Sequence, residues 1–464
     1  MTDRSVSDIA RDVARGRVSA REVVSASLDA IEREQPRLNA FITVMRTSAL
    51  AAADGIDRRR ARREPLGPLA GVPLAVKDLL FTHDALTTAG SRIYGDGLPA
   101  QADAPVVRRL RRAGCVVVGK ANLHEVALGV TNVNEHFGAA RNPWDTTRVS
   151  GGSSGGSAVA VAADLVPLAI GTDTRGSIRI PAAACGITGF KPTYGLVSVE
   201  HVIPLAYSLD HVGPMARSVD DAALMLAAML PPAKGGALLR GSRAAVKRLV
   251  IGISEYHMRD LDGPIARALE AALKDLRPLV RDLREVRIPE LDGVQEASTI
   301  LASSEAVAFH DEFLRTRPEG YGPLVRQRME AGYTRTAVEY VRAQVKRSMV
   351  QVAYAEAFGS VDLLVGATLP VAPPTIEAPT LVHINGRELS TVEAFTRCNG
   401  PQNVAGIPAL SVPAGFVKGL PVALQVMGAM GRDATVLALG RAWQRHTDWH
   451  ERRPKGQAVR RAGP

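Results

Sequence analysis

The sequence is poor in cysteine and in aromatic residues. Its 464 residues include only three cysteines, Cys115, Cys185 and Cys398, and 4% of the residues are aromatic. Three scattered thiols without a Cys-x-x-Cys pair do not form a disulfide framework, and they favour a reducing compartment. We expect Cys185, which lies among small apolar residues, to be a structural thiol and not a nucleophile. The low aromatic content gives no sign of a pocket built from aromatic rings.

A long hydrophobic run is also missing. The longest apolar stretch, residues 158–170, is interrupted by Asp164 and Pro167 and is too short to cross a bilayer as a helix. The polar start of the chain lacks the apolar segment of a secretion signal. The sequence therefore predicts a soluble cytoplasmic protein with no membrane partner.

Motifs for nucleic acids, metals and phosphates are absent as well. The formal net charge is +10, but the excess gathers in the tail and in short runs such as 58–63 and 108–112, which is typical of solvated surfaces. The ten histidines are dispersed, and the glycine-rich stretch 151–157 lacks the lysine and hydroxyl residue that complete a phosphate loop. We expect no nucleic-acid partner, no metal and no cofactor.

The order of the secondary-structure signals predicts an α/β fold. Helical patterns fill residues 5–60, and a short apolar run at 69–80 predicts a buried strand. Helical periodicity dominates 260–360, and strand signals return after it. Because no linker separates these parts, we expect one domain. Its predicted divisions are N-terminal helices (1–60), a motif-bearing core (61–235), a variable helical region (236–360), a C-terminal sheet and helix (361–453) and a basic tail (454–464).

Two loops rich in glycine and serine carry the strongest chemical signal. "GGSSGGS" (151–157) and "GTDTRGS" (171–177) lie at the two ends of an apolar segment that we predict to be a helix followed by a strand. Backbone N–H groups in a tight turn before Ser177 could converge on a developing oxyanion. A serine nucleophile needs a base, but no G-x-S-x-G motif with a clear histidine partner is present. Lys77, in the apolar stretch "VPLAVKDLL", could serve if burial lowered its pKa from about 10.4 to roughly 7–8, with Ser153 as a relay.

These stretches resemble the amidase signature family. "GVPLAVKD", "GGSSGGS" and "GTDTRGSIRIPAAACGITGFKPTYG" look like its defining motifs, their spacing agrees, and weaker similarity extends over residues 5–453. The resemblance implies a large mixed, twisted β-sheet covered by helices on both faces. It also implies a Ser-cisSer-Lys triad in which Ser177 forms an acyl-enzyme, Ser153 follows a cis peptide bond and Lys77 is the base. The resemblance assigns the oxyanion hole to the backbone N–H groups of Thr174, Arg175, Gly176 and Ser177.

Arg175 departs from the family pattern, because family members usually have glycine at this position. Arginine would be strained there if the loop required a positive φ; its guanidinium could point outward or toward a polar group of the substrate. We expect Asp173 and Arg179 to hold the loops in place through hydrogen bonds. Leu128 and Thr131 are predicted to line the substrate pocket, together with parts of the helical region 300–345.

The resemblance leaves two functions open. The first is a free-standing amide hydrolase that cleaves the carbon–nitrogen bond of an acyl amide, aryl amide, urea or carbamate. It would act on a small molecule, and a homodimer is the assembly we consider. The second is the glutaminase-like A subunit of a tRNA-dependent amidotransferase, in which ammonia is channelled to a tRNA-bound substrate. Because the segment before residue 360 looks divergent from the tRNA enzyme, the first function is the main prediction.

Overall fold

One large mixed β-sheet runs through the protein. The computed structural model describes residues 4–454, so the predicted basic tail lies outside the described residues except for Pro454. Eleven strands pair in the order β1-β3-β2-β4-β6-β5-β12-β13-β9-β7-β8, with parallel and antiparallel neighbours. This arrangement confirms the predicted mixed sheet. The strands are β1 (Phe41–Val44), β2 (Pro73–Lys77), β3 (Val116–Ala121), β4 (Leu168–Asp173), β5 (Thr188–Lys191), β6 (His211–Ala216), β7 (Val250–Ser254), β8 (Asp282–Val286), β9 (Leu363–Ala367), β12 (Ala409–Val417) and β13 (Leu420–Gly428).

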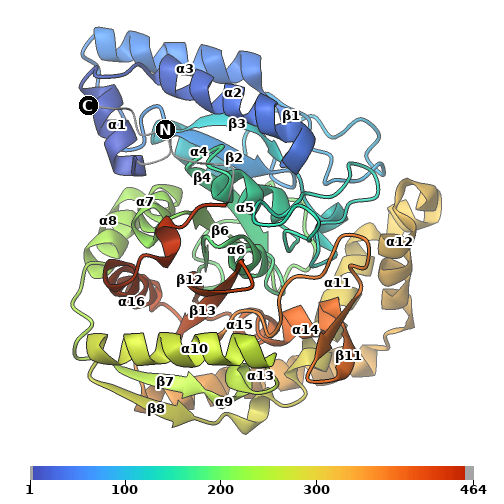
Figure 1. The fold of residues 1–464 in the computed structure, drawn as a ribbon. Helices are drawn as coiled ribbons and strands as arrows, with labels where there is room; N and C mark the ends of the chain where they lie inside the picture. The colour runs from blue at the N-terminus through green and yellow to red at the C-terminus, as the bar shows by residue number, and fades with distance from the viewer. Residues whose placement is uncertain (1–3, 455–464) are drawn as a thin grey trace.

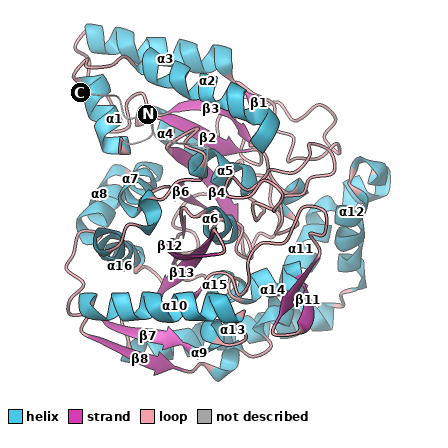
Figure 2. Cartoon of the chain, in the orientation of Figure 1, coloured by secondary structure: helices cyan, strands magenta, loops and turns pink. Residues whose placement is uncertain are grey.

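Helices surround the sheet. Figure 1 shows α7, α8 and α16 to the left of the central strands and α11, α12 and α14 to their right. Figure 2 shows the central strands, in magenta, between these helices, whereas β7, β8 and β11 lie at the periphery. The helices are α1 (Val6–Ala14), α2 (Ala20–Leu38), α3 (Arg46–Ala61), α4 (Pro105–Arg112), α5 (Gly155–Ala162), α6 (Arg179–Cys185), α7 (Val219–Met229), α8 (Pro232–Gly241), α9 (Glu255–Met258), α10 (Gly263–Leu276), α11 (Val294–Thr316), α12 (Pro323–Glu330), α13 (Ala337–Ser360), α14 (Thr391–Arg397), α15 (Gly400–Ala405) and α16 (Asp433–His446).

The N-terminal part is helical except for one strand. Helices α1 and α2 begin at capping serines, Ser5 and Ser19, whose side chains accept hydrogen bonds from backbone N–H groups of the first turn. Between α2 and α3, β1 pairs antiparallel with β3. The prediction of helices alone over 5–60 missed this strand, because four residues are too few to show an alternating pattern.

The two glycine- and serine-rich loops lie at the centre of the sheet. β2 and β4 are adjacent, parallel and wholly buried, so their carboxyl ends meet at the same edge. Lys77 is the last residue of β2, and Asp173 is the last residue of β4. The first loop leads into α5, and the second loop leads from β4 into α6. The buried α5–β4 unit therefore fixes the position of one loop relative to the other.

The predicted variable helical region (236–360) contains two strands in addition to its helices. β7 and β8 are parallel, and β7 joins them to the sheet through β9. Each of these strands has five residues, and β8 is only partly buried. Apolar runs this short are not distinguished from helical segments by periodicity. The expectation of a purely helical region was therefore incomplete.

The C-terminal part returns to the sheet through the hairpin of β12 and β13, which pair with β5 and β9. A second hairpin, β10 (Leu381–Ile384) with β11 (Arg387–Ser390), forms a separate two-stranded sheet. Its turn is Asn385–Gly386, both with positive φ, and this dipeptide is common in tight hairpins. Among the described residues, no helix has the length and apolar character needed to cross a membrane. The organisation as one domain stays a prediction.

Candidate active site

A buried lysine lies at the centre of the candidate site. The side chain of Lys77 is fully buried, and its Nζ lies 2.7 Å from both Ser153 Oγ and Thr172 Oγ1. Burial lowers the pKa of Lys77 to about 7, although the charges of Asp173 and Asp210 act in the opposite direction. Near neutral pH a large fraction of this amine is therefore uncharged and able to accept a proton.

The loop that carries Ser153 is held against the neighbouring strand and the second loop. The Gly152–Ser153 peptide bond is cis. The N–H of Ser154 donates to the carbonyl oxygen of Ser177 (3.2 Å), and the Ser154 hydroxyl donates to the carbonyl oxygen of Thr172 (3.1 Å). The predicted relay serine is thus adjacent in space to both the lysine and the loop of the predicted nucleophile.

The carboxylate of Asp173 organises the loop that contains Ser177. Its Oδ1 accepts a hydrogen bond from the N–H of Gly176 (2.7 Å), and its Oδ2 accepts one from the N–H of Ile178 (3.1 Å). The guanidinium of Arg179 binds both oxygens at 3.0 Å. Burial alone would raise the pKa of Asp173, but the charge and hydrogen bonds of Arg179 lower it. Asp173 therefore stays ionised and fixes the turn.

The four predicted oxyanion donors are not equivalent. Gly176 directs its N–H to Asp173, so this group is not free for a substrate, which corrects the prediction at that position. Among residues 4–454, the N–H groups of Thr174, Arg175 and Ser177 have no backbone or side-chain acceptor. The positive φ of the turn, 118°, falls on Gly176 and not on Arg175. The arginine therefore fits the loop without the strain considered above.

Ser177 opens into a cavity of about 480 Å³. Leu128 lines this cavity, whereas Thr131 does not; the Thr131 hydroxyl lies 3.4 Å from Nδ1 of His124 instead. The predictions from the sequence missed Thr172, although it stands in the same motif as Ser177. The helical region 300–345 does contribute to the cavity, as predicted, through residues that the sequence did not single out: Ser303, Arg328 and Arg335. The predictions missed Thr299 and Thr396, which lie outside that region. No local motif marks them, because tertiary packing brings their helices to the site.

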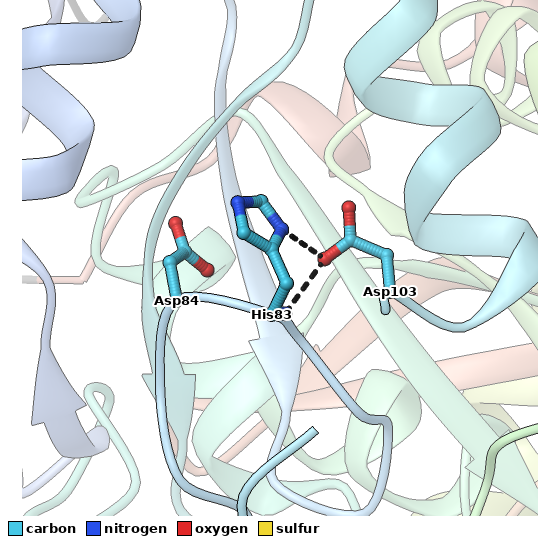
Figure 3. Close-up of side chains that lie close together, drawn as sticks. All are labelled: His83, Asp84 and Asp103. Atoms are coloured by element: carbon cyan, nitrogen blue, oxygen red, sulfur yellow. Dashed lines mark hydrogen bonds and ion pairs between the residues drawn. The ribbon is translucent and has the colours of Figure 1, made fainter. Parts of the chain in front are cut away.

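A separate cluster, His83, Asp84 and Asp103, has the residue types of a metal site. Figure 3 shows His83 between the two aspartates, with its backbone N–H and its ring Nδ1 directed to Oδ1 of Asp103 (3.0 and 2.9 Å). The guanidinium of Arg111 already binds Asp84 (2.7 Å) and Asp103 (3.1 Å). This cation compensates the two carboxylates, so the cluster forms an ion-pair network around Arg111.

Comparisons with known proteins agree on a family. A family model described as Amidase matches residues 22–437. The A subunit of the glutamyl-tRNA(Gln) amidotransferase of Chloroflexus aggregans is 40% identical, over 95% of this chain and 96% of that protein.

Two solved structures show the same fold. One is described as a vestigial protein complex that reveals the evolutionary origins of an s-triazine catabolic enzyme (TM-score 0.90, 36% identity, 95% of this chain and 98% of that chain). The other is the A subunit of the glutamyl-tRNA(Gln) amidotransferase of Thermotoga maritima (TM-score 0.76, 33% identity, 91% of each chain).

These relatives overturn two predictions from the sequence. The free-standing hydrolase was preferred because the segment before residue 360 looked divergent, but the similarity to amidotransferase subunits extends over 95% of the chain. Divergence within one segment is compatible with similarity over nearly the whole chain, so it did not separate the two functions. The predicted partners, a small-molecule amide and no nucleic acid, are wrong for the same reason, since the relatives' shared name includes both a tRNA and a subunit. The homodimer stays a prediction.

Proposed function

Because the chain belongs to the amidase family and is an enzyme that acts on carbon–nitrogen bonds, we propose that it is the glutaminase-like A subunit of a tRNA-dependent amidotransferase. In this role it hydrolyses the carboxamide of glutamine and supplies ammonia to a tRNA-bound substrate held by partner subunits. The observation that carries the proposal is the nearly full-length similarity to proteins named as this subunit. The cytoplasmic location expected from the sequence is part of the proposal.

The first half of the proposed reaction forms an acyl-enzyme. Uncharged Lys77 accepts the proton of the Ser153 hydroxyl, and Ser153 accepts the proton of Ser177 while Ser177 Oγ attacks the amide carbon. The resulting oxyanion receives hydrogen bonds from the free N–H groups of Thr174, Arg175 and Ser177. The 2.7 Å contact between Lys77 and Ser153 and the lowered pKa of Lys77 support this assignment.

The second half returns the proton and restores the enzyme. The protonated Lys77 gives its proton back through Ser153 to the leaving nitrogen, which departs as ammonia when the carbon–nitrogen bond breaks. A water molecule then attacks the ester of Ser177, and the same relay accepts its proton. Glutamate leaves, and the hydroxyl of Ser177 is regenerated.

One helix surface supports assembly with another chain. Five apolar side chains of α13 are at least half exposed: Val338, Val341, Val345, Met349 and Val352. Their spacing of three and four residues places them on one face of the helix. A contiguous exposed apolar face is typical of a protein–protein contact, as the role of a subunit requires.

The test is tRNA-dependent amidation by the chain together with the other subunits of an amidotransferase. We expect the wild type to form glutaminyl-tRNA from glutamyl-tRNA with either glutamine or ammonium chloride as the nitrogen source. Ser177→Ala should lose the reaction with glutamine and keep the reaction with ammonium chloride, because only the first needs the nucleophile. The control is Ser7→Ala, an exposed serine of α1, which should keep both.

Two results would count against the proposal. One is a wild type that hydrolyses small amides alone but gives no tRNA product with any partner subunits. The other is a Ser177→Ala variant that still uses glutamine.

A further inference from the structure

Arg175 lines the same cavity as Ser177, and in the described part of the chain its charge has no carboxylate partner. Its Nη2 donates to the hydroxyls of Thr299 (2.9 Å) and Thr396 (3.1 Å), and its Nε is buried without a hydrogen-bond partner. Burial lowers the pKa of Arg175 to about 10. The guanidinium is therefore still protonated at neutral pH and is incompletely satisfied.

The two threonines position this guanidinium but do not neutralise it. The Thr299 hydroxyl donates to the carbonyl oxygen of Gln295 (2.9 Å), and the Thr396 hydroxyl donates to that of Val392 (2.7 Å). Each hydroxyl proton is thus directed to the preceding turn of its own helix, and an oxygen lone pair remains for Arg175. The result is a fixed orientation of the cation toward neutral acceptors.

The other charges of the cavity do not supply the missing counterion. Among the described residues that line it there is no aspartate or glutamate. The other two cations of the cavity each have an acid nearby that partly offsets their charge. The negative charge of Glu135 acts on Arg328. A carboxylate oxygen of Glu339 lies 3.9 Å from the guanidinium of Arg335. For Arg175, by contrast, the described residues provide no acid that offsets its charge.

We propose that Arg175 binds a carboxylate of the substrate, so that this site selects amides whose acyl part ends in a carboxylate. Because the two threonines occupy both N–H groups of Nη2, the charge-assisted hydrogen bond to the carboxylate comes from Nη1. The inference rests on the proposed function and deepens it, because glutamine carries such a carboxylate. The described residues that line this cavity include no acid to hold an ammonium group, so the test compares glutamine with an amide that lacks one.

The test measures binding to the Ser177→Ala variant by titration calorimetry, so that it does not depend on turnover. Three probes differ at one end: glutaramate has a carboxylate, glutamine has a carboxylate and an ammonium, and pentanamide has a methyl group. We expect glutaramate to bind at least as tightly as glutamine and about 30-fold more tightly than pentanamide. Adding Arg175→Met should reduce the ratio between glutaramate and pentanamide to about threefold or less.

Two matched variants separate recognition from loop structure. Arg175→Lys keeps the charge without the planar guanidinium and should give an intermediate ratio. The control Arg315→Gln, at an exposed position of α11 outside the cavity, should leave the ratio unchanged. If Arg175→Met weakens glutaramate and pentanamide equally, Arg175 only supports the loop and the inference is wrong. Equal affinity of the two probes for the parent, or no binding of glutaramate, also overturns it.

The proposed function is tested by the amidation assay with tRNA, which is independent of the binding test of Arg175. A carboxylate preference that depends on Arg175 would stand even if no tRNA product formed.

Discussion

Four buried cations of this protein form two pairs that differ in their partners. Lys120 of β3 lies 2.9 Å from a carboxylate oxygen of Asp78, and Arg179 binds both oxygens of Asp173. Lys77 of β2 and Arg175 contact only hydroxyl groups. Lys77 and Lys120 stand on neighbouring strands and point to opposite faces of the sheet, because Lys120 is in register with Val76.

This difference separates structural cations from reactive ones. When a buried cation is paired with a carboxylate, the two charges offset each other, and the ion pair holds two segments of the chain together. A buried lysine among hydroxyls has no counterion to keep it charged, so its pKa falls to about 7. Burial also lowers the pKa of Lys120, but the charge of Asp78 opposes this effect. Lys77 and Arg175 both lie at the site of Ser177, where a base and an anion-binding group are useful. A third buried cation without a carboxylate partner, Lys191, instead donates to the carbonyl oxygens of Pro192 and Ile407, so it is the hydroxyl partners and the cavity that distinguish the two site cations.

Replacement of Lys77 should have the largest effect on activity and little effect on stability. Lys77→Met removes the proposed base, so we expect glutamine hydrolysis to fall by about 100- to 10,000-fold. The melting temperature should stay within about 3 °C of the wild type, because methionine removes an amine whose burial is unfavourable. Steady-state kinetics and thermal unfolding measure the two effects. Ordinary activity at neutral pH would exclude Lys77 as the base.

Replacement of Lys120 should give the opposite result. Lys120→Met leaves the buried carboxylate of Asp78 without its cation, so the free energy of unfolding should fall by about 3–5 kcal/mol. The activity of the molecules that remain folded should change little. Urea unfolding measures the loss, and the double variant Lys120→Met/Asp78→Asn should recover most of it. If Lys120→Met left the free energy of unfolding unchanged, Lys120 would not be a structural cation, and the contrast with Lys77 would be wrong.

The pH dependence of catalysis should report the protonation of Lys77. Only the uncharged amine can act as base, so kcat/KM should fall about tenfold for each pH unit below about 7 and level off above it. A pH series from 5 to 9, with stability checked at each pH, measures this. A profile that is still rising about tenfold per pH unit at pH 9 would mean that burial does not lower the pKa of this lysine.

Replacement of Thr172 should have a smaller effect, on the pKa of Lys77 and on kcat. Thr172→Val removes a hydroxyl that accepts a hydrogen bond from Lys77, so the charged amine loses more than the neutral one. The acid limb of the pH profile should therefore move to lower pH by about half a unit, and kcat should fall by about five- to tenfold. Ser157→Ala, whose hydroxyl donates to a backbone carbonyl of β4, is the control. An acid limb that moves to higher pH would contradict this role of Thr172.

Local motifs were enough to predict the buried lysine and the two loops, and the family resemblance that they carry implied the mixed sheet. Lys77, Ser153 and Ser177 stand in short segments whose residue types are dictated by tight turns and buried strands. Local motifs could not predict which residues surround Arg175 in the cavity. Its partners Thr299 and Thr396 belong to α11 and α14, more than a hundred residues further along the sequence, and only the tertiary fold brings them together. The orientation of the Gly176 N–H toward Asp173 depends on the geometry of the turn and not on its composition.

The most direct test of the central claim is a titration of Lys77 itself. In enzyme labelled with ¹³C at lysine Cε, the signal that disappears in Lys77→Met can be followed by NMR as the pH is raised. We predict a midpoint at about pH 7. A midpoint near 10, the value of an ordinary exposed lysine, would show that the amine is charged at neutral pH and cannot be the base.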